Sequence, residues 1–256
     1  MYSQNSSQLA IYFFTKKEAQ EFIWDDNDNY IKNMSKSDLI ARQFINNYSI
    51  NTYSIHNYSI NNYSINNYSN NNNYSNNYSN NYKYKTICAT FALEDFTENE
   101  KDELVYLFMM IQTNPFIFGN YNFIKINSVY ENGYPHTREN IIFIPQSFFA
   151  KNIKEKKITL LHECIHIYQR YYPKETEFIL NAYQFYKVGN FKDLFPDKYA
   201  MRRSNPDLDD NIWKDQYGIL MFPIFNSIRP KNMSDILNHD DREHPYEWMA
   251  YTFSQY

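Results

Sequence analysis

Two histidines and a glutamate lie close together in the segment ITLLHECIHIYQR, which runs from Ile158 to Arg170. His162 and His166 are four residues apart, and Glu163 directly follows the first histidine. In a helix, residues four apart differ by about 40° in rotation and lie one turn apart on the same face. Two imidazoles placed in this way can both bind one metal ion, with a carboxylate beside it.

Zinc is the ion that this donor set favours. A catalytic zinc has three protein ligands and a fourth position for water, whose pKa the ion lowers toward about 7. Glu163 would then act as the general base toward the zinc-bound water. The alternative is a helix whose histidines are only hydrogen-bonded side chains.

The motif is predicted to lie on a helix that ends before Pro173 and is buried on two sides. His162 and His166 would then belong to a polar strip that faces a cleft, while Cys164 points away from it. The apolar residues on the two sides are Ile158, Leu161, Ile165 and Tyr168, and then Leu160 and Ile167.

Other elements are predicted from capping residues and from apolar periodicity. Helices are expected after Phe14, from about Ser35, from Thr97 and around 174–188, and a last helix within 244–255. Strands are expected at 86–93, 121–127 and 141–145, with a loop at 128–140. Thr97 and Glu100 form a capping box, and the core stripe of that helix is Leu104, Leu107, Phe108 and Ile111.

The segment 47–82 repeats a unit close to Asn-Tyr-Ser-Ile-Asn. Its period is too short for a solenoid repeat, and it offers no continuous apolar face. It is therefore interpreted as a disordered low-complexity insertion, with a tyrosine-rich self-association tract as the alternative. Residues 1–46 and 83–256 would form a single catalytic domain interrupted by this loop.

Composition limits the classes of partner. The formal net charge of −4 gives no electrostatic reason to expect nucleic acid or an anionic membrane surface as a partner. The sequence contains no run of about 18 apolar residues, so no membrane span is predicted. The start of the chain does not resemble a signal peptide, and there are only two cysteines, so a cytoplasmic, non-secreted protein is expected.

The segment TLLHECIHIYQRYYP resembles the active-site helix of the zincin metallopeptidases. The low-complexity tract and the layout resemble the zinc metalloproteinases of giant DNA viruses of protists, which would place the protein in the host cytoplasm or the virion. The resemblance is sharpest over 134–173 and 205–250. It implies an α+β zincin-like domain with a mixed sheet and a central HExxH helix, and a zinc ion bound by His162 and His166.

The resemblance also limits the third zinc ligand. A metzincin would have Gly at 169 and His at 172, but this chain has Gln169 and Tyr172. The aspartate-ligand signature is absent too, which leaves a glutamate on a second helix, as in gluzincins. Glu247, three residues after His244 in HPYEWMAYTF, is the expected ligand. The alternatives are Glu243, then Asp207, Asp209 and Asp210, while Glu175 and Glu177 lie too close to Pro173 to fold back.

The predicted function is a zinc metallopeptidase that hydrolyses a peptide or protein substrate. The alternative is an inactive zincin-like structural or interaction protein. His136 is either a donor to the tetrahedral oxyanion or a surface-loop residue. Arg170 would pair with a carboxylate near Asp207 or hold a substrate carboxylate. Trp248, Tyr251 and Thr252 are expected to anchor the last helix in the core.

Overall fold

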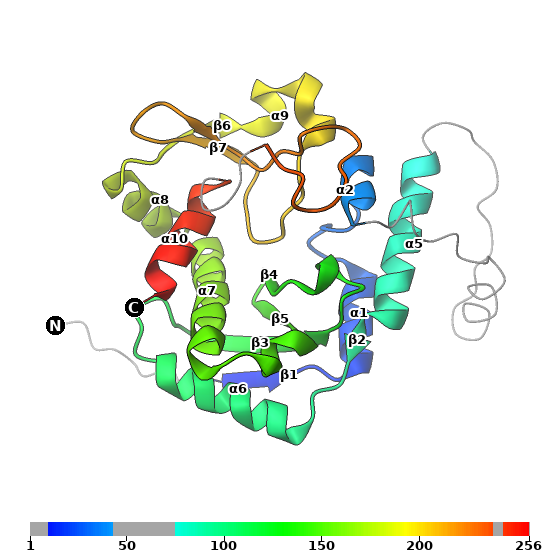
Figure 1. Cartoon of the computed structure of the whole chain (residues 1–256), viewed down its shortest axis with the longest axis vertical. Helices are drawn as coiled ribbons and strands as arrows, with labels where there is room; N and C mark the ends of the chain where they lie inside the picture. Colours follow the sequence, from blue (N-terminus) through cyan, green and yellow to red (C-terminus); the bar gives the residue numbers. More distant parts are fainter. Residues whose placement is uncertain (1–9, 43–74, 238–242, 256) are drawn as a thin grey trace.

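The computed structural model describes residues 10–42, 75–237 and 243–255. The fold is mixed α+β, with one mixed sheet between two helical layers and a smaller sheet above it (Figure 1). Among these residues no helix combines the length and the apolar composition needed to cross a bilayer.

The main sheet has the strand order β1-β3-β5-β4, and β2 pairs with β3. β3 is parallel to β1 and β5, whereas β2 and β4 run antiparallel to their neighbours, so the sheet is mixed. The strands are β1 (Ala10–Phe13), β2 (Leu93–Glu94), β3 (Asn120–Ile126), β4 (His136–Arg138) and β5 (Ile141–Pro145).

Each face of this sheet packs on helices because its apolar side chains alternate between the two faces. One face contributes Tyr121, Phe123, Ile142 and Ile144 to a core shared with α6 (Glu98–Ile111) and α7 (Ile153–Tyr171). The other face contributes Ile124, Ile126, Ile141 and Phe143 to a core shared with α1 (Lys16–Asp25) and α5 (Ser75–Phe91).

Helix α6 matches its prediction. Thr97 and Glu100 form the reciprocal capping box, and the expected core stripe of four residues is buried. Helix α7 begins with a second capping box, in which Asn152 accepts from the backbone of Glu155 and the Glu155 carboxylate accepts in return. It ends at Tyr171, before Pro173 starts α8 (Pro173–Ala182). Cys164 is fully buried, as expected.

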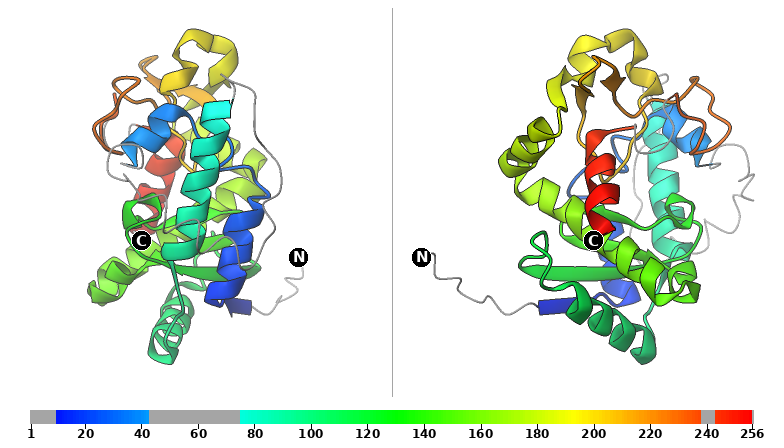
Figure 2. Two further views of the ribbon diagram at one scale, coloured as in Figure 1. Left: turned by 90° about the vertical axis from the view of Figure 1, so that its right-hand side faces the viewer. Right: turned by 60° about the vertical axis from the view of Figure 1, so that its left-hand side comes forward.

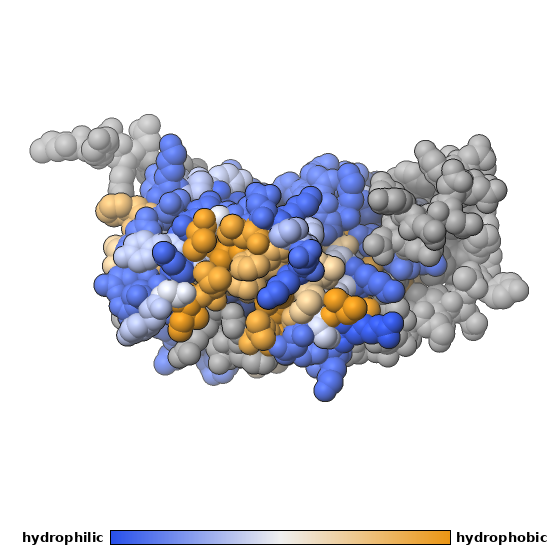
Figure 3. Space-filling view, turned by 90° about the horizontal axis from the view of Figure 1, so that it is seen from above, coloured by the Kyte–Doolittle hydropathy of each residue, from blue (hydrophilic) through white to orange (hydrophobic). Residues whose placement is uncertain are grey.

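The upper part of the molecule is built around a three-stranded antiparallel sheet, β6-β7-β8, with its own small core. The view from above shows an apolar area on this side of the molecule, surrounded by hydrophilic side chains (Figure 3). The elements are β6 (Tyr186–Asn190), α9 (Phe191–Leu194), β7 (Asn211–Lys214) and β8 (Leu220–Met221). The remaining short helices are α2 (Lys36–Ala41), η1 (Glu131–Gly133), η2 (Gln146–Ala150) and η3 (Pro196–Met201).

The last helix, α10 (Pro245–Ser254), lies against α7 (Figure 2). Its buried face is formed by Tyr246, Met249 and Ala250, not by the three residues expected from spacing. Trp248 instead packs on the rings of Phe185 and Tyr183 at the end of α8, and Tyr251 is 51% exposed. Of the expected anchors, Trp248 is partly buried and packs against the main core, whereas Tyr251 is exposed, because a helix this short buries one narrow face.

Further expectations differ from the structure. The helix expected around 174–188 ends at Ala182, and β6 begins at Tyr186. Residues 86–91 belong to helix α5, not to a strand, and only the pair Leu93–Glu94 is extended. Helix α5 starts at Ser75, so the expected end of the insertion at residue 82 falls inside an ordered helix. Asn81 is buried and donates to the carbonyls of Ile31, Lys32 and Met34. Residues 47–74 of the expected insertion lie outside the described part of the chain.

Candidate metal centre

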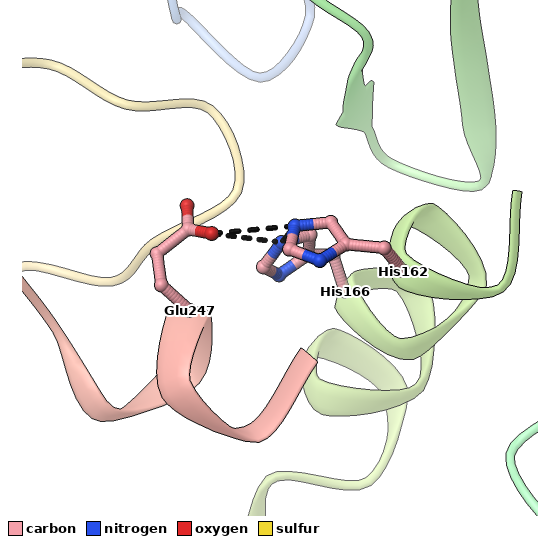
Figure 4. Close-up of side chains that lie close together, drawn as sticks. All are labelled: His162, His166 and Glu247. Carbon is pink, nitrogen blue, oxygen red and sulfur yellow. Dashed lines mark hydrogen bonds and ion pairs between the residues drawn. The ribbon is translucent and has the colours of Figure 1, made fainter. Parts of the chain in front are cut away.

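His162, His166 and Glu247 converge from helices α7 and α10 (Figure 4). The Glu247 Oε2 atom lies 3.3 Å from His162 Nε2 and 3.6 Å from His166 Nε2. The two Nε2 atoms are 3.0 Å apart. The side chains expected to bind zinc are therefore brought together by two helices that are distant in sequence.

These spacings match one face of a zinc coordination tetrahedron. Zinc bonds to imidazole nitrogen and carboxylate oxygen are about 2.0–2.2 Å long, which places tetrahedral ligand atoms about 3.3 Å apart. The three distances of 3.0, 3.3 and 3.6 Å lie around that value. The donor set and its geometry thus fit a zinc ion with a fourth position facing the cleft.

Gln169 fixes the proton on the ring of His166. The amide nitrogen of Gln169 donates to the carbonyl of Tyr246, 2.9 Å away, and a carbonyl can only accept. The amide oxygen must therefore face His166 Nδ1, 2.8 Å away, and accept its proton. In the neutral ring the lone pair is then on Nε2 and aimed at the centre, which is the form that binds a metal.

Asn205 orients the third candidate ligand. Its side-chain amide donates to Oε1 of Glu247 over 3.2 Å, so the other oxygen, Oε2, faces the histidine pair. Asn205 carried no signal in the sequence, because it lies 42 residues before Glu247 in a polar loop. Gln169, one turn beyond His166, could have been found from its spacing.

The electrostatic surroundings favour a cation at this point. Burial alone would lower the pKa of His166, but Asp207, Glu247 and Glu163 raise it to about 9. Burial would raise the pKa of the Glu247 carboxyl, but the two histidines hold it well below its usual range. The acidic side chains around the His166 ring thus favour positive charge at this point, and a bound divalent cation would supply it.

Glu163 lies beside the centre with one oxygen free. Its side chain is buried, and Oε2 has no hydrogen-bond partner among the described residues. Burial, together with Asp207 and Glu247, raises the pKa of its carboxyl well above the usual range. A buried acceptor without a hydrogen-bond partner lowers the stability of the fold unless a ligand or a water molecule donates to it. The position suits a group that exchanges a proton with a bound water.

A cleft of about 520 Å³ opens over these residues. Its walls come from the loop before β4, from the first turns of α7, from the loop 203–207 and from the segment around Met233. Five acidic side chains line it, namely Glu131, Glu163, Asp207, Glu243 and Glu247. The volume is in the range of a small-molecule or short-peptide site.

The alternative third ligands are engaged elsewhere. Glu243 forms an ion pair with Arg203, and Asp207 accepts from the backbone and hydroxyl of Thr137. Asp209 contacts His244 and Tyr246, and Asp210 pairs with Arg202. Glu175 and Glu177 are exposed on α8 and do not line the cleft.

His136 fits neither of its two expected roles. It is only 3% exposed and stacks on Phe143 at a centroid distance of 4.5 Å, so it is not a surface-loop residue. Its Nδ1 lies 2.9 Å from the carbonyl of Tyr134, which fixes the proton there. Burial lowers the pKa of this imidazole and keeps it neutral. Nε2 therefore carries no proton and cannot donate to an oxyanion.

Arg170 and His244 have structural contacts. Arg170 donates to the carbonyls of Glu139 and Pro206 and to the hydroxyl of Thr137, and so holds a loop against β4; within the described part of the chain it contacts no carboxylate. His244, fully buried, caps α10 by accepting from the backbone of Tyr246.

Comparisons with family models, with curated proteins and with solved structures each found no match to this chain. The interpretation of the centre therefore rests on its geometry and on the chemistry of its donor atoms.

Proposed function

We propose that the protein is a zincin-like zinc metallopeptidase that hydrolyses a peptide or protein substrate. The observation that carries the proposal is the triangle of His162, His166 and Glu247 donor atoms, with the spacing of a zinc site. Beside it lies the carboxylate of Glu163, whose Oε2 has no hydrogen-bond partner in the described part of the chain. Further support comes from the α+β fold with a mixed sheet and from the resemblance of the motif segment to zincins.

Each residue has a defined task in this proposal. His162, His166 and Glu247 would hold the ion, which supplies Lewis acidity and lowers the pKa of water toward about 7. Glu163 accepts the proton of the attacking water on its free Oε2 and passes it to the leaving amine. Gln169 and Asn205 keep His166 and Glu247 in the form and orientation that binding requires.

The test is a digest of a peptide library by the zinc-loaded protein and by Glu163→Gln. The variant removes the proton acceptor but keeps the size of the side chain. It should retain zinc and lose cleavage by about 10²–10⁴-fold or more, the usual contribution of a general base. Full activity in Glu163→Gln would remove this residue from the mechanism. Zinc binding without cleavage by the native protein would instead support an inactive scaffold.

A further inference from the structure

The outer edge of β4 borders the cleft but offers few groups to a peptide. β4 pairs only with β5 among the described residues, and Tyr134, Pro135 and His136 line the cleft. An extended peptide can pair with such an edge only through free backbone N–H and C=O groups. Pro135, just before the strand, has no N–H.

The next backbone N–H that points away from β5 on this edge belongs to Thr137, and it already donates a hydrogen bond. Thr137 donates its backbone N–H and its hydroxyl to Oδ1 of Asp207, both over 2.7 Å. Arg170 donates to the Thr137 hydroxyl and, further along, to the carbonyl of Glu139. The edge of β4 therefore has no free N–H group at Pro135 or Thr137, and side chains cover it beyond Thr137.

The loop that carries Asp207 is held firmly against the rest of the molecule. Ser204 donates its backbone N–H and hydroxyl to the buried carboxylate of Asp38. Asn205 is bonded to Glu247, and the carbonyl of Pro206 accepts from Arg170. With these contacts on successive residues, the loop forms a fixed wall at this end of the cleft.

Two acceptors are left free at this wall. Oδ2 of Asp207 has no hydrogen-bond partner among the described residues, and the carbonyl of Thr137 points the same way as its N–H. Asp207 also lies close enough to Glu163 and His166 to influence both electrostatically. A substrate carboxylate would be repelled here, whereas a positively charged donor would be bound.

We propose that Asp207, in the loop that Arg170 holds against β4, closes the cleft at the end of this strand and restricts the protein to substrates with a free amino terminus next to the cleaved bond. The protein would then be an aminopeptidase, with the substrate ammonium group bound by Asp207. This inference rests on the proposed peptidase function, since it assigns the substrate class of the same site.

The test compares two peptides of one sequence, cleaved by the zinc-loaded full chain. One has a free amino terminus and the other is acetylated, and both are amidated at the carboxyl end. Acetylation should lower kcat/KM by about tenfold or more, because it removes a charge-assisted hydrogen bond. Equal cleavage of both peptides would overturn the inference and leave the peptidase function intact. No cleavage of either, nor of any library peptide, would overturn both.

The variant Asp207→Asn separates the negative charge of Asp207 from its hydrogen bonds to Thr137. Asp207→Asn keeps an oxygen for Thr137 but lacks the charge, so it should lose the preference for the free amino terminus while retaining zinc. Asp197→Asn is the matched control, because Asp197 is exposed on η3 and outside the cleft. An unchanged preference in Asp207→Asn, measured as the ratio of the two kcat/KM values, would contradict the role of this carboxylate.

Discussion

At the scale of single residues, the amide of Gln169 connects the two helices that carry the candidate ligands. One end of the amide accepts from His166 on α7, and the other donates to the carbonyl of Tyr246 in the first turn of α10, the residue directly before Glu247. The direction of these two bonds cannot be reversed, because the Tyr246 carbonyl has no proton to give. Gln169 therefore sets both the tautomer of one ligand and the position of the helix that carries another.

Replacing Gln169 by leucine should weaken zinc binding by about 10–100-fold, the usual effect of losing a group that orients a metal-bound histidine. The affinity is measured by competition with a chelator, and the melting temperature of the zinc-free variant gives the purely structural part of the effect. Gln146→Leu, at an exposed position, is the control and should bind zinc normally. An unchanged affinity in Gln169→Leu would contradict the positioning role.

Glu247 and Glu243 should respond differently to removal of their carboxylates. Glu247→Ala deletes a ligand atom, so zinc affinity should fall by orders of magnitude. Glu243→Ala leaves Arg203 largely buried without its partner, so it should lower the melting temperature and change zinc affinity little. Glu243→Gln keeps a hydrogen-bond acceptor for Arg203 and serves as its control. The reverse ranking of zinc affinities would assign the ligand to Glu243.

At the scale of elements, local signals explain which predictions succeeded. The capping box at Thr97 and the apolar run of β5 act over a few residues, and the helix and the strand that they predict are present. Pro245 opens α10 and puts Glu247 in its first turn, also as expected. Strand β4 was missed because three residues between turns carry too little pattern.

Helix α5 escaped prediction for a different physical reason. Its first half is rich in Asn, Tyr and Ser, which have low helix propensity. The helix is stabilised by tertiary contacts instead, because Tyr84, Ile87 and Cys88 are buried against α1 and the sheet. Such contacts depend on residues distant in sequence and leave no local signal.

Asn81 offers a test of this tertiary stabilisation. Its amide nitrogen lies 3.0 Å from each of three carbonyls in the turn after α1. Asn81→Ala should destabilise the protein by about 1–3 kcal/mol, because buried carbonyls lose their donor. Lys83→Ala, at an exposed position of the same helix, should be neutral. Equal melting temperatures of the two variants would show that α5 does not depend on Asn81. In that case, deleting residues 47–82 should not destabilise the protein through the loss of Asn81.

At the scale of the whole molecule, the cleft is assembled from segments far apart in the chain. The bond between Ser204 and Asp38 spans 166 residues, and that between Thr137 and Asp207 spans 70. The motif helix could be predicted from the sequence because its spacing is local. The loop 203–207, which closes one end of the cleft, could not, because its position depends on bonds to α2, β4, α7 and α10.

The central claim is that His162, His166 and Glu247 form a zinc site. The most direct measurement is the zinc content of the protein purified under metal-replete conditions, determined by mass spectrometry for the native chain and for His162→Ala. The native protein should contain about one zinc ion per chain, and the variant should contain much less after dialysis against a weak chelator. A native protein without zinc, or a His162→Ala variant with the same zinc content as the native chain, would contradict the claim.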